Sequence, residues 1–405
     1  MIKTYYLMRL TQLSPLRISS GEGEHADSDL IMDARGFPYI PGSSLAGVLR
    51  AMLPKNVGDR LFGTLTDSPC SIVVSDAVLR CGETDFSVTV RDGVGLDDAG
   101  TAEENKKYDF EVLECAAPYH AVLEVNDHMP EMQLLMQEIA AEDGLRVGGR
   151  TTRGYGRMRV EIRQRKFSFP EDLVEWLEWD SFAAASWNEC DPVILQASLS
   201  DRQTVVQAEI SIRGSFTVRS FVGEDQLNNT YLTDRDGHPV IPGTAWAGVF
   251  RHHMRVLARE LGFGADRLEQ IDLLFGMRDG QEGFLRSAIL FSETVIAGGK
   301  PYRWTRVGVD RVTAAPSNGK LFTNEYCEGG TGILTIHLPK DGLAPWQRQL
   351  TACCLMDLDS GILHFGGEGS VGRGNVEITR LTVDGTDRTE ALKTHMLTQP
   401  GEVMV

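Results

Sequence analysis

The sequence lacks the features of a membrane or disulfide-stabilised protein. No apolar run approaches the roughly 20 residues that a membrane-spanning helix needs, and residues 1–10 do not have the layout of a signal peptide. The seven cysteines are odd in number and include no C-x-x-C pair and no following pair of histidines. We therefore expect a cytoplasmic protein with no membrane contact, whose thiols are reduced and mostly buried.

Positive charge is also scarce, since the formal net charge is −17. Phosphate contacts need clustered Lys and Arg, so this balance argues against a general nucleic-acid binder. Any RNA-binding interpretation must depend on local basic clusters, although such clusters can equally be solvated surface. Two such clusters are present: Arg146, Arg150, Arg153, Arg157 and Arg159 in one, and Arg303, Arg306 and Arg311 in the other.

The chain contains an internal duplication. Residues 37–50 return in near-identical form as residues 238–251, with the second proline of each block, Pro41 and Pro242, 201 positions apart. A repeat of this length indicates a duplicated domain. A chain of 405 residues is long enough for two domains of just under two hundred residues each.

Each duplicated block predicts a strand, a proline stop and then an amphipathic helix. We expect Ser43 or Ser44, and Thr244 in the second copy, to cap the helix, with Arg50 and Arg251 on its first turns. Open amides at a helix start attract anions, so a Pro-Gly-Ser/Thr turn can hold a phosphate. A single copy would be read as a simple strand-to-helix turn, but the duplication of the whole block favours function.

Two glycine-rich segments form a second repeated motif. Residues 148–157 and residues 366–374 both run directly into predicted strands. Such loops permit positive φ and close backbone approach to a phosphate or ribose, although a tight turn or β-bulge has the same composition. The first segment adds Arg150, Arg153 and Arg157, which favours RNA contact. Long hairpins are also predicted around residues 90–110 and 305–322.

The order strand, helix, strand, hairpin and glycine loop in each half predicts an α+β fold. We expect two tandem domains with ferredoxin-like (RRM-like) cores of antiparallel sheet plus helices, each with a projecting thumb-like hairpin. The predicted boundaries are a first domain at 1–165, a connector at 166–202, a second domain at 203–385 and a C-terminal tail at 386–405. The connector contains Trp176, Trp179 and Trp187 and is expected to be partly helical and packed.

Together the Pro-Gly helix block, the arginine-bearing hairpin and the glycine loop resemble the RAMP superfamily of CRISPR proteins. More narrowly, the chain is similar to the repeated backbone subunits of type III effector complexes, as a tandem fusion of two. The resemblance implies a subunit that binds CRISPR guide RNA and complementary target RNA beside other effector subunits. The acidic total charge then requires a local basic strip.

The resemblance also implies one catalytic residue. In that family an Asp in the loop before the Pro-Gly block cuts target RNA with a divalent metal such as Mg²⁺. Asp27, six residues before Asp33, has the matching spacing, with Asp29 where the family often has Pro. Asp27 is thus expected to be both the catalytic and the metal-binding residue. The second copy has Asn228 instead and is expected to be inactive, because an amide has neither charge nor basicity.

Several alternatives remain open at this stage. Asp27 can be a turn residue in a non-catalytic RNA scaffold, and the chain can be a metal-independent endoribonuclease that processes precursor guide RNA. Asp29, Asp33 or His25 can assist Asp27. The residues expected to bind RNA share positions in the duplicated blocks, glycine loops and hairpins: Ser43, Ser44, Arg50, Arg150, Arg153, Arg157, Thr244, Arg251, Arg306, Arg311 and Arg373.

Overall fold

A computed structural model places most of the chain. The structure describes residues 1–19, 29–64, 69–79, 86–96, 102–126, 129–141, 144–195, 203–220, 229–276, 278–279 and 283–397. The chain divides into two compact units. Unit 1 comprises Met1–Arg91, Tyr108–Thr151 and Tyr155–Ser200, and unit 2 comprises Asp92–Lys107, Thr152–Gly154 and Asp201–Val405.

Unit 1 is built on one antiparallel sheet. Its strands are β1 (Ile2–Gln12), β2 (Tyr39–Ile40), β3 (Ile72–Val74), β4 (Ala77–Leu79), β7 (Tyr119–Asn126), β8 (Leu145–Arg146), β9 (Arg157–Ser168) and β10 (Asp191–Pro192). Its helices are α1 (Gly42–Met52), α2 (Lys55–Phe62), α3 (Glu131–Ala141), α4 (Leu173–Glu178) and α5 (Ser186–Glu189). The strand order β10-β9-β1-β7-β4-β2 places β1 in the centre. The chain order β1, α1, β4, β7, α3, β9 with this sheet order is the ferredoxin-like arrangement.

The central strand β1 is buried on both faces of the sheet. Met8 and Leu10 belong to the core beneath helices α1, α2 and α3. Tyr5 and Leu7 point to the other face, where they pack with Trp187 and other aromatic side chains of the connector. The Trp176 indole N–H donates to the Tyr5 hydroxyl at 2.8 Å. Because the connector contains α4 and α5 and covers a sheet face, the expectation of a partly helical, packed segment is confirmed.

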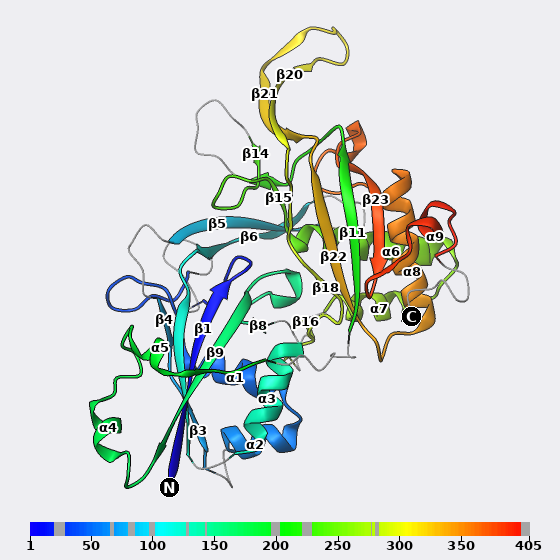
Figure 1. Cartoon of the computed structure of the whole chain (residues 1–405). Coiled ribbons are helices and arrows are strands. Elements are labelled where there is room, and N and C mark those ends of the chain that lie inside the picture. Colours follow the sequence, from blue (N-terminus) through cyan, green and yellow to red (C-terminus); the bar gives the residue numbers. More distant parts are fainter. Residues whose placement is uncertain are drawn as a thin grey trace. The chain divides into compact units, whose positions relative to one another are not determined.

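Unit 2 repeats the ferredoxin-like arrangement. Its main strands are β11 (Gln203–Arg213), β18 (Leu290–Phe291), β22 (Thr331–Pro339), β23 (Asn375–Val383) and β24 (Thr386–Asp387), in the order β18-β22-β11-β23-β24. Its helices are α6 (Gly243–Glu260), α7 (Ala265–Leu274), α8 (Pro345–Ser360) and α9 (Thr389–Lys393). Figure 1 shows α6 and α8 beside the long strands β11, β22 and β23.

The sheet of unit 2 is buried on one face only. Along β11, Val206, Ala208, Ile210 and Ile212 are buried, and residues between them are half-buried or exposed. This period of two indicates a sheet with one face on the core and one face toward solvent. The two copies therefore share a fold but differ in what covers the second face of the sheet.

Shorter strands and two long hairpins complete the structure. The shorter strands of unit 2 are β12 (Ser215–Phe216), β13 (Arg219–Ser220), β14 (Thr230–Tyr231), β15 (Val240–Ile241), β16 (Arg278–Asp279), β17 (Gly283–Phe284) and β19 (Thr294–Val295). The hairpins are β5 (Phe86–Leu96) with β6 (Ala102–Cys115), and β20 (Lys300–Val309) with β21 (Pro316–Glu328). The second hairpin, yellow in Figure 1, extends beyond the body of unit 2. Both predicted hairpins are confirmed.

The predicted helix caps are wrong. Both helices begin after the proline at the expected position, but Pro41 and Pro242 are the cap residues, and no side chain caps either start. Instead the Gly42 amide donates to the Asp76 carboxylate at 2.7 Å. A β-carbon on Gly42 would lie 2.6 Å from the Val74 carbonyl oxygen. Glycine is needed here because the start of the helix packs against the backbone of the following strand.

Two general expectations can be compared with the described part of the chain. Its cysteines are free thiols; Cys70 is exposed, Cys353 is partly buried, and Cys115, Cys190, Cys327 and Cys354 are buried. Cys81 lies outside the described residues. None of the described helices combines the length and apolar character needed to cross a membrane.

Candidate RNA-binding site

The two glycine loops have the same backbone conformation. Positive φ recurs at four equivalent positions: Gly148, Arg150, Gly154 and Gly156 in the first loop, and Gly366, Glu368, Gly372 and Gly374 in the second. A short 3-10 helix occupies the middle of each loop, at Thr151–Arg153 and Gly369–Val371. The correspondence places Arg150 and Glu368 at the same left-handed position, which is uncommon for residues other than glycine.

Matching backbone hydrogen bonds hold both loops. The Gly149 amide donates to the Arg17 carbonyl at 2.7 Å, and the Gly367 amide donates to the Thr217 carbonyl at 2.9 Å. The last glycine of each loop, Gly156 or Gly374, accepts from the residue before the loop at 2.8 or 3.0 Å. Each loop is thus a closed, ordered structure that fixes the direction of the side chain at its third position.

The first loop presents Arg150 on an aromatic surface. The Arg150 guanidinium donates to the Tyr108 hydroxyl at 3.0 Å and lies 4.6 Å and 4.5 Å from the ring centroids of Tyr108 and Phe110. The Arg17 guanidinium lies 4.9 Å from the Phe110 centroid. Cationic groups over ring faces are a stable arrangement that leaves their charge available to an anion.

Arg17 and Arg150 form a positive site without a carboxylate. In the part of the chain that the structure describes, neither guanidinium has an ion pair, and the buried Arg17 Nε has no hydrogen-bond partner. Burial, followed by the neighbouring Arg150 charge, lowers the pKa of Arg17. A lowered pKa of an arginine means that the charged form is destabilised, and a bound phosphate would relieve this. We name Arg17, Tyr108, Phe110 and Arg150 the Arg150 site.

Sequence reasoning identified Arg150 but missed Arg17. Arg17 is 133 positions away along the chain and is not part of a basic cluster. The sheet brings the two together, because the loop that follows β1 runs beside the glycine loop before β9. The only sequence signal was the position of Arg17 near the end of the strand-like stretch at residues 3–18, which is too weak to select one arginine.

The second loop carries the opposite charge at the equivalent position. The Glu368 carboxylate accepts hydrogen bonds from Arg306 Nη2, from Arg373 Nε at 3.1 Å and from the Tyr326 hydroxyl at 3.1 Å. The Arg373 guanidinium also lies 3.5 Å from the centroid of the Tyr326 ring. Two of the arginines that were predicted to bind RNA are therefore paired with an internal carboxylate.

The electrostatics of Glu368 follow from these contacts. Burial alone would raise the pKa of its carboxyl, but the hydrogen bonds and charge of Arg306, with Tyr326 and Arg373, hold the pKa below its usual range. The carboxylate form is therefore stabilised, and Glu368 carries a full negative charge at neutral pH.

Ser43, Ser44 and Thr244, which were predicted to bind RNA, lie in the first turns of α1 and α6. Ser43 is exposed, whereas Ser44 and Thr244 are half-buried. Their role in RNA binding remains a prediction.

The arginines of these blocks are not on the first helical turns, which corrects that expectation. Arg50 lies in the last turn of α1 and pairs with Asp59, and Arg251 lies inside α6 and donates to Asp272 at 2.9 Å. Both arginines are the ninth residue of their helix, about two turns from its start, so neither lies on the first turn.

The positions of the remaining predicted residues neither support nor contradict a role in RNA binding. Arg153 and Arg157 are half-buried within and after the first glycine loop, and Arg311 is exposed in the turn between β20 and β21. The catalytic prediction, Asp27, its counterpart Asn228 and the neighbouring His25 all lie outside the described residues.

Asp33 has a structural role in the turn before the Pro-Gly block. Its carboxylate accepts the Phe37 amide at 2.9 Å and pairs with the Arg35 guanidinium at 2.7 Å. These contacts, led by the Phe37 amide, lower the pKa of Asp33. A carboxylate occupied in this way is a turn residue, as expected for Asp in such a position.

The equivalent turn of unit 2 holds a group of possible metal ligands. Asp234, Asp236 and His238 place one ligand atom each within 4.8 Å of one another, but Asp236 and His238 are exposed. The Asp234 carboxylate already accepts the amides of Asp236 and His238 at 3.0 and 2.8 Å. The same hydrogen bonds occur around Asp33, so the arrangement is explained by the turn itself.

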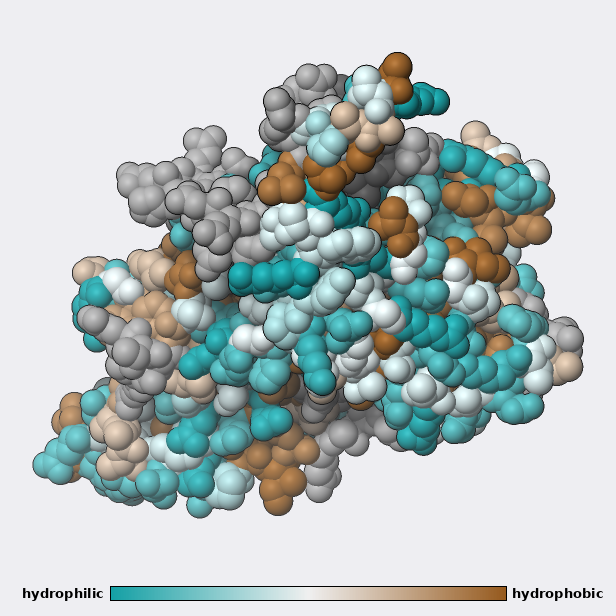
Figure 2. Space-filling view, turned by 90° about the horizontal axis from the view of Figure 1, so that it is seen from above, coloured by the Kyte–Doolittle hydropathy of each residue, from teal (hydrophilic) through white to brown (hydrophobic). Residues whose placement is uncertain are grey.

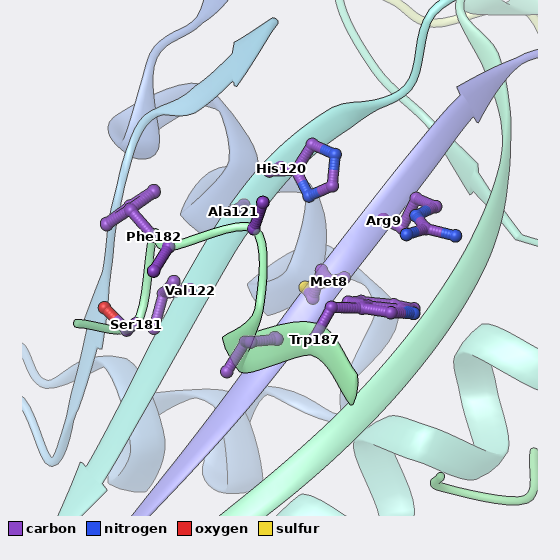
Figure 3. Close-up of a pocket in the computed structure, with 11 residues that line it drawn as sticks. Met8, Arg9, His120, Ala121, Val122, Ser181, Phe182 and Trp187 are labelled. Atoms are coloured by element: carbon purple, nitrogen blue, oxygen red, sulfur yellow. The ribbon is translucent and has the colours of Figure 1, made fainter. Parts of the chain in front are cut away.

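A small pocket lies on the connector side of the sheet in unit 1. It has a volume of about 250 Å³ and is lined by β1, β7 and the segment before α5. Figure 3 shows Arg9 and His120 close to Trp187 in its wall, and the Arg9 guanidinium is 4.2 Å from the Trp187 ring centroid. Among the described residues around this pocket, none is an arginine of the glycine loops. It is separate from the Arg150 site.

The surface shown in Figure 2 is mixed in character. Apolar residues form small scattered patches among hydrophilic ones, with no broad apolar area on the described part of that face.

The comparison with protein families identifies the class of the chain. The family model of the RAMP superfamily matches residues 9–159 and 216–377, which together are more than half of the chain. The chain belongs to the RAMP superfamily, as two tandem RAMP domains. Proteins of this superfamily are CRISPR-associated and bind RNA. No curated protein sequence matches the chain.

Proposed function

We propose that this chain is a guide-RNA-binding backbone subunit of a type III CRISPR effector complex. In this proposal, unit 1 grips the guide RNA at the Arg150 site and cuts the complementary target RNA with Asp27 and a divalent metal. Unit 2 has Asn228 in place of Asp27 and acts as scaffold only.

The observation that carries the RNA-binding part is the uncompensated positive charge of Arg17 and Arg150. Two guanidinium groups flank the Phe110 ring, and no carboxylate pairs with them among the described residues. A phosphate group supplies the missing negative charge. This local site also reconciles RNA binding with a net charge of −17.

The cleavage part of the proposal rests on the chemistry of the residue at position 27. Cleavage by the adjacent 2′-hydroxyl needs an in-line geometry, neutralised phosphate charge and proton transfer. An aspartate can hold a hydrated metal or accept the proton, whereas an asparagine can only donate or accept a hydrogen bond. The difference between Asp27 and Asn228 therefore predicts one cut per chain.

The test is cleavage of a labelled complementary RNA by the assembled effector complex with Mg²⁺. Asp27→Asn, which copies the residue of the second unit, is expected to abolish one defined cut while RNA binding is retained. Asp29→Asn is the matched control in the same loop and is expected to leave the cut in place. An unchanged cut pattern in Asp27→Asn would instead make the chain a non-catalytic scaffold.

A reciprocal variant tests the assignment of unit 2. Asn228→Asp restores a carboxylate at the equivalent position and is expected to add a second cut at a new, fixed distance from the first. Cleavage that persists after metal chelation would support the metal-independent endoribonuclease alternative and contradict the proposed metal role.

A further inference from the structure

The two glycine loops have the same backbone but opposite charge at their central position. We infer that Glu368 fills a phosphate-binding site in unit 2 with its own carboxylate, and so closes the second glycine loop to RNA. This inference rests on the proposed function, because it concerns how the RNA is shared between the two copies.

The donors around Glu368 form a complete anion site. They come from β13, β20, β21 and the end of the glycine loop. Four of them donate a side-chain N–H or O–H to the carboxylate, and the fifth, Arg219, forms an ion pair without a hydrogen bond. The set comprises Arg219 (3.6 Å), Arg306, Asn324 (3.4 Å), Tyr326 (3.1 Å) and Arg373 (3.1 Å).

This donor set fits an RNA phosphate as well as it fits a carboxylate. A phosphodiester and a carboxylate both present two terminal oxygens that share one negative charge, and arginine binds both in the same planar geometry. The carboxylate also leaves a donor unused, because the buried Arg306 Nε has no hydrogen-bond partner in the described structure. A ribose-phosphate group has further oxygens that can accept from it.

The carboxylate at the centre of the site is largely shielded from solvent, although Arg219 at its edge is exposed. The side chain of Glu368 is 11% exposed and that of Arg373 is 6% exposed. An intramolecular carboxylate in a shielded site competes strongly with an external phosphate. It is tethered next to its donors at a high effective concentration, and its binding loses no translational and rotational entropy of association. RNA in solution therefore meets a second loop whose anion site is already occupied by Glu368, whereas the equivalent position of the first loop carries the positive charge of Arg150.

The experiment removes the carboxylate from the full-length chain and measures RNA affinity. Glu368→Gly is the first variant, because glycine readily adopts the φ of 62° found at this position. Binding of a single-stranded RNA of guide length is measured by fluorescence anisotropy over a range of salt concentrations. We expect a rise in affinity on the order of tenfold at low salt and a steeper salt dependence, by about one additional phosphate contact.

The matched control is Glu325→Gln. Glu325 lies on the same strand β21 and pairs with Arg303 at 2.8 Å, but this pair lies outside the Glu368 donor set. Glu325→Gln removes one negative charge, as Glu368→Gly does. If Glu368→Gly gains no more affinity than Glu325→Gln, the effect is only one of net charge and the inference is wrong.

A second variant guards against loss of folding. Glu368→Gln keeps the size of the side chain and removes its charge, so it is expected to show a smaller gain in the same direction. No gain in either variant, with unchanged circular dichroism, would overturn the inference.

The outcomes separate this inference from the proposed function. Arg150→Ala tests the RNA site of unit 1 and is expected to weaken binding in both the wild-type and the Glu368→Gly background. If wild-type protein binds RNA through Arg150 but Glu368→Gly has no effect, only the inference fails. If wild type does not bind RNA but Glu368→Gly does, the inference holds and the proposed function fails.

Discussion

The last glycine of each loop offers a quantitative test of the shared loop structure. Gly156 and Gly374 have φ values of 70° and 71°, and a β-carbon on either would lie 1.8 Å from a backbone oxygen, that of Val147 or Phe365. Alanine cannot be accommodated by a side-chain movement, because the obstructing atom belongs to the main chain. We expect Gly156→Ala and Gly374→Ala to open the loops in which they lie.

The expected cost has two parts. An L-residue at such a φ costs about 1–2 kcal/mol. Displacing the loop breaks two backbone hydrogen bonds, which for Gly156 are its contacts to Val147 and Pro15, both 2.8 Å. At about 1 kcal/mol each, these bring the loss in the free energy of unfolding to about 3–4 kcal/mol.

A control separates the two parts. Gly237 has a φ of 83°, but a β-carbon there would meet nothing within 4 Å. Gly237→Ala should therefore cost only the conformational part, about 1–2 kcal/mol. Gly248 lies inside α6 with open space around it. Gly248→Ala should therefore raise the free energy of unfolding, by up to about 1 kcal/mol, because alanine is the better helix former at an exposed position.

The assay is urea unfolding followed by circular dichroism, with hydrogen exchange of β1 and β11 to assign the change to one unit. We expect the free energy of unfolding to be highest for Gly248→Ala, lower for wild type, lower still for Gly237→Ala, and lowest for the two loop variants. If Gly156→Ala costs no more than Gly237→Ala, the close contact with Val147 does not exist and the loop geometry described here is wrong.

Three further predictions follow from single sites. Trp246→Phe should lower the free energy of unfolding by about 2–3 kcal/mol, because it removes buried volume and the 3.0 Å hydrogen bond to Thr294; urea unfolding measures this. Burial raises the pKa of Cys327 to about 11 from 9.0. The buried thiol therefore stabilises the fold below pH 9, and this contribution to the free energy of unfolding is lost as pH rises toward 11. If the urea midpoints of wild type and Cys327→Ala respond equally to this pH change, the prediction is wrong. The pKa of Glu368 is lowered from 4.5, so its contribution is present above pH 4.5 and lost as pH falls through the folded value, and Glu368→Gln should flatten the acid side of the stability profile.

Much of the fold could be predicted from the sequence because the same series of motifs occurs in both halves of the chain. The duplicated Pro-Gly block fixed the register of the two copies, and the apolar periodicity then identified the helices that follow Pro41 and Pro242. The hairpins and the strands after the glycine loops followed in the same order. Repetition made weak local signals reliable, since a chance similarity is not expected to be followed by further matches in the same order.

The helix starts show where local rules failed. Serine or threonine after a strand usually caps a helix, but here the tertiary contact between Gly42 and Asp76 supplies a partner from the connection between β3 and β4. A partner that is 34 positions away cannot be predicted from the local motif. The same limit applied to Arg50, whose partner Asp59 lies on the next helix.

The candidate site could be predicted only in part. Arg150 belonged to a visible cluster, but Arg17 became part of the site only through the sheet. The contrast between Arg150 and Glu368 was present in the sequence, yet it gained meaning only when both residues were found at the same backbone position. A carboxylate in a glycine loop does not by itself indicate which arginines it neutralises.

The central claim is that the chain binds guide RNA through the Arg150 site. The most direct measurement is the affinity of full-length protein for a CRISPR guide RNA in wild type, Arg150→Ala and, for comparison, Arg311→Ala, over a range of salt concentrations. The account predicts that Arg150→Ala weakens binding on the order of tenfold and makes the salt dependence shallower by about one phosphate contact, with a smaller effect for Arg311→Ala. Equal affinities and equal salt dependence in wild type and Arg150→Ala would contradict it.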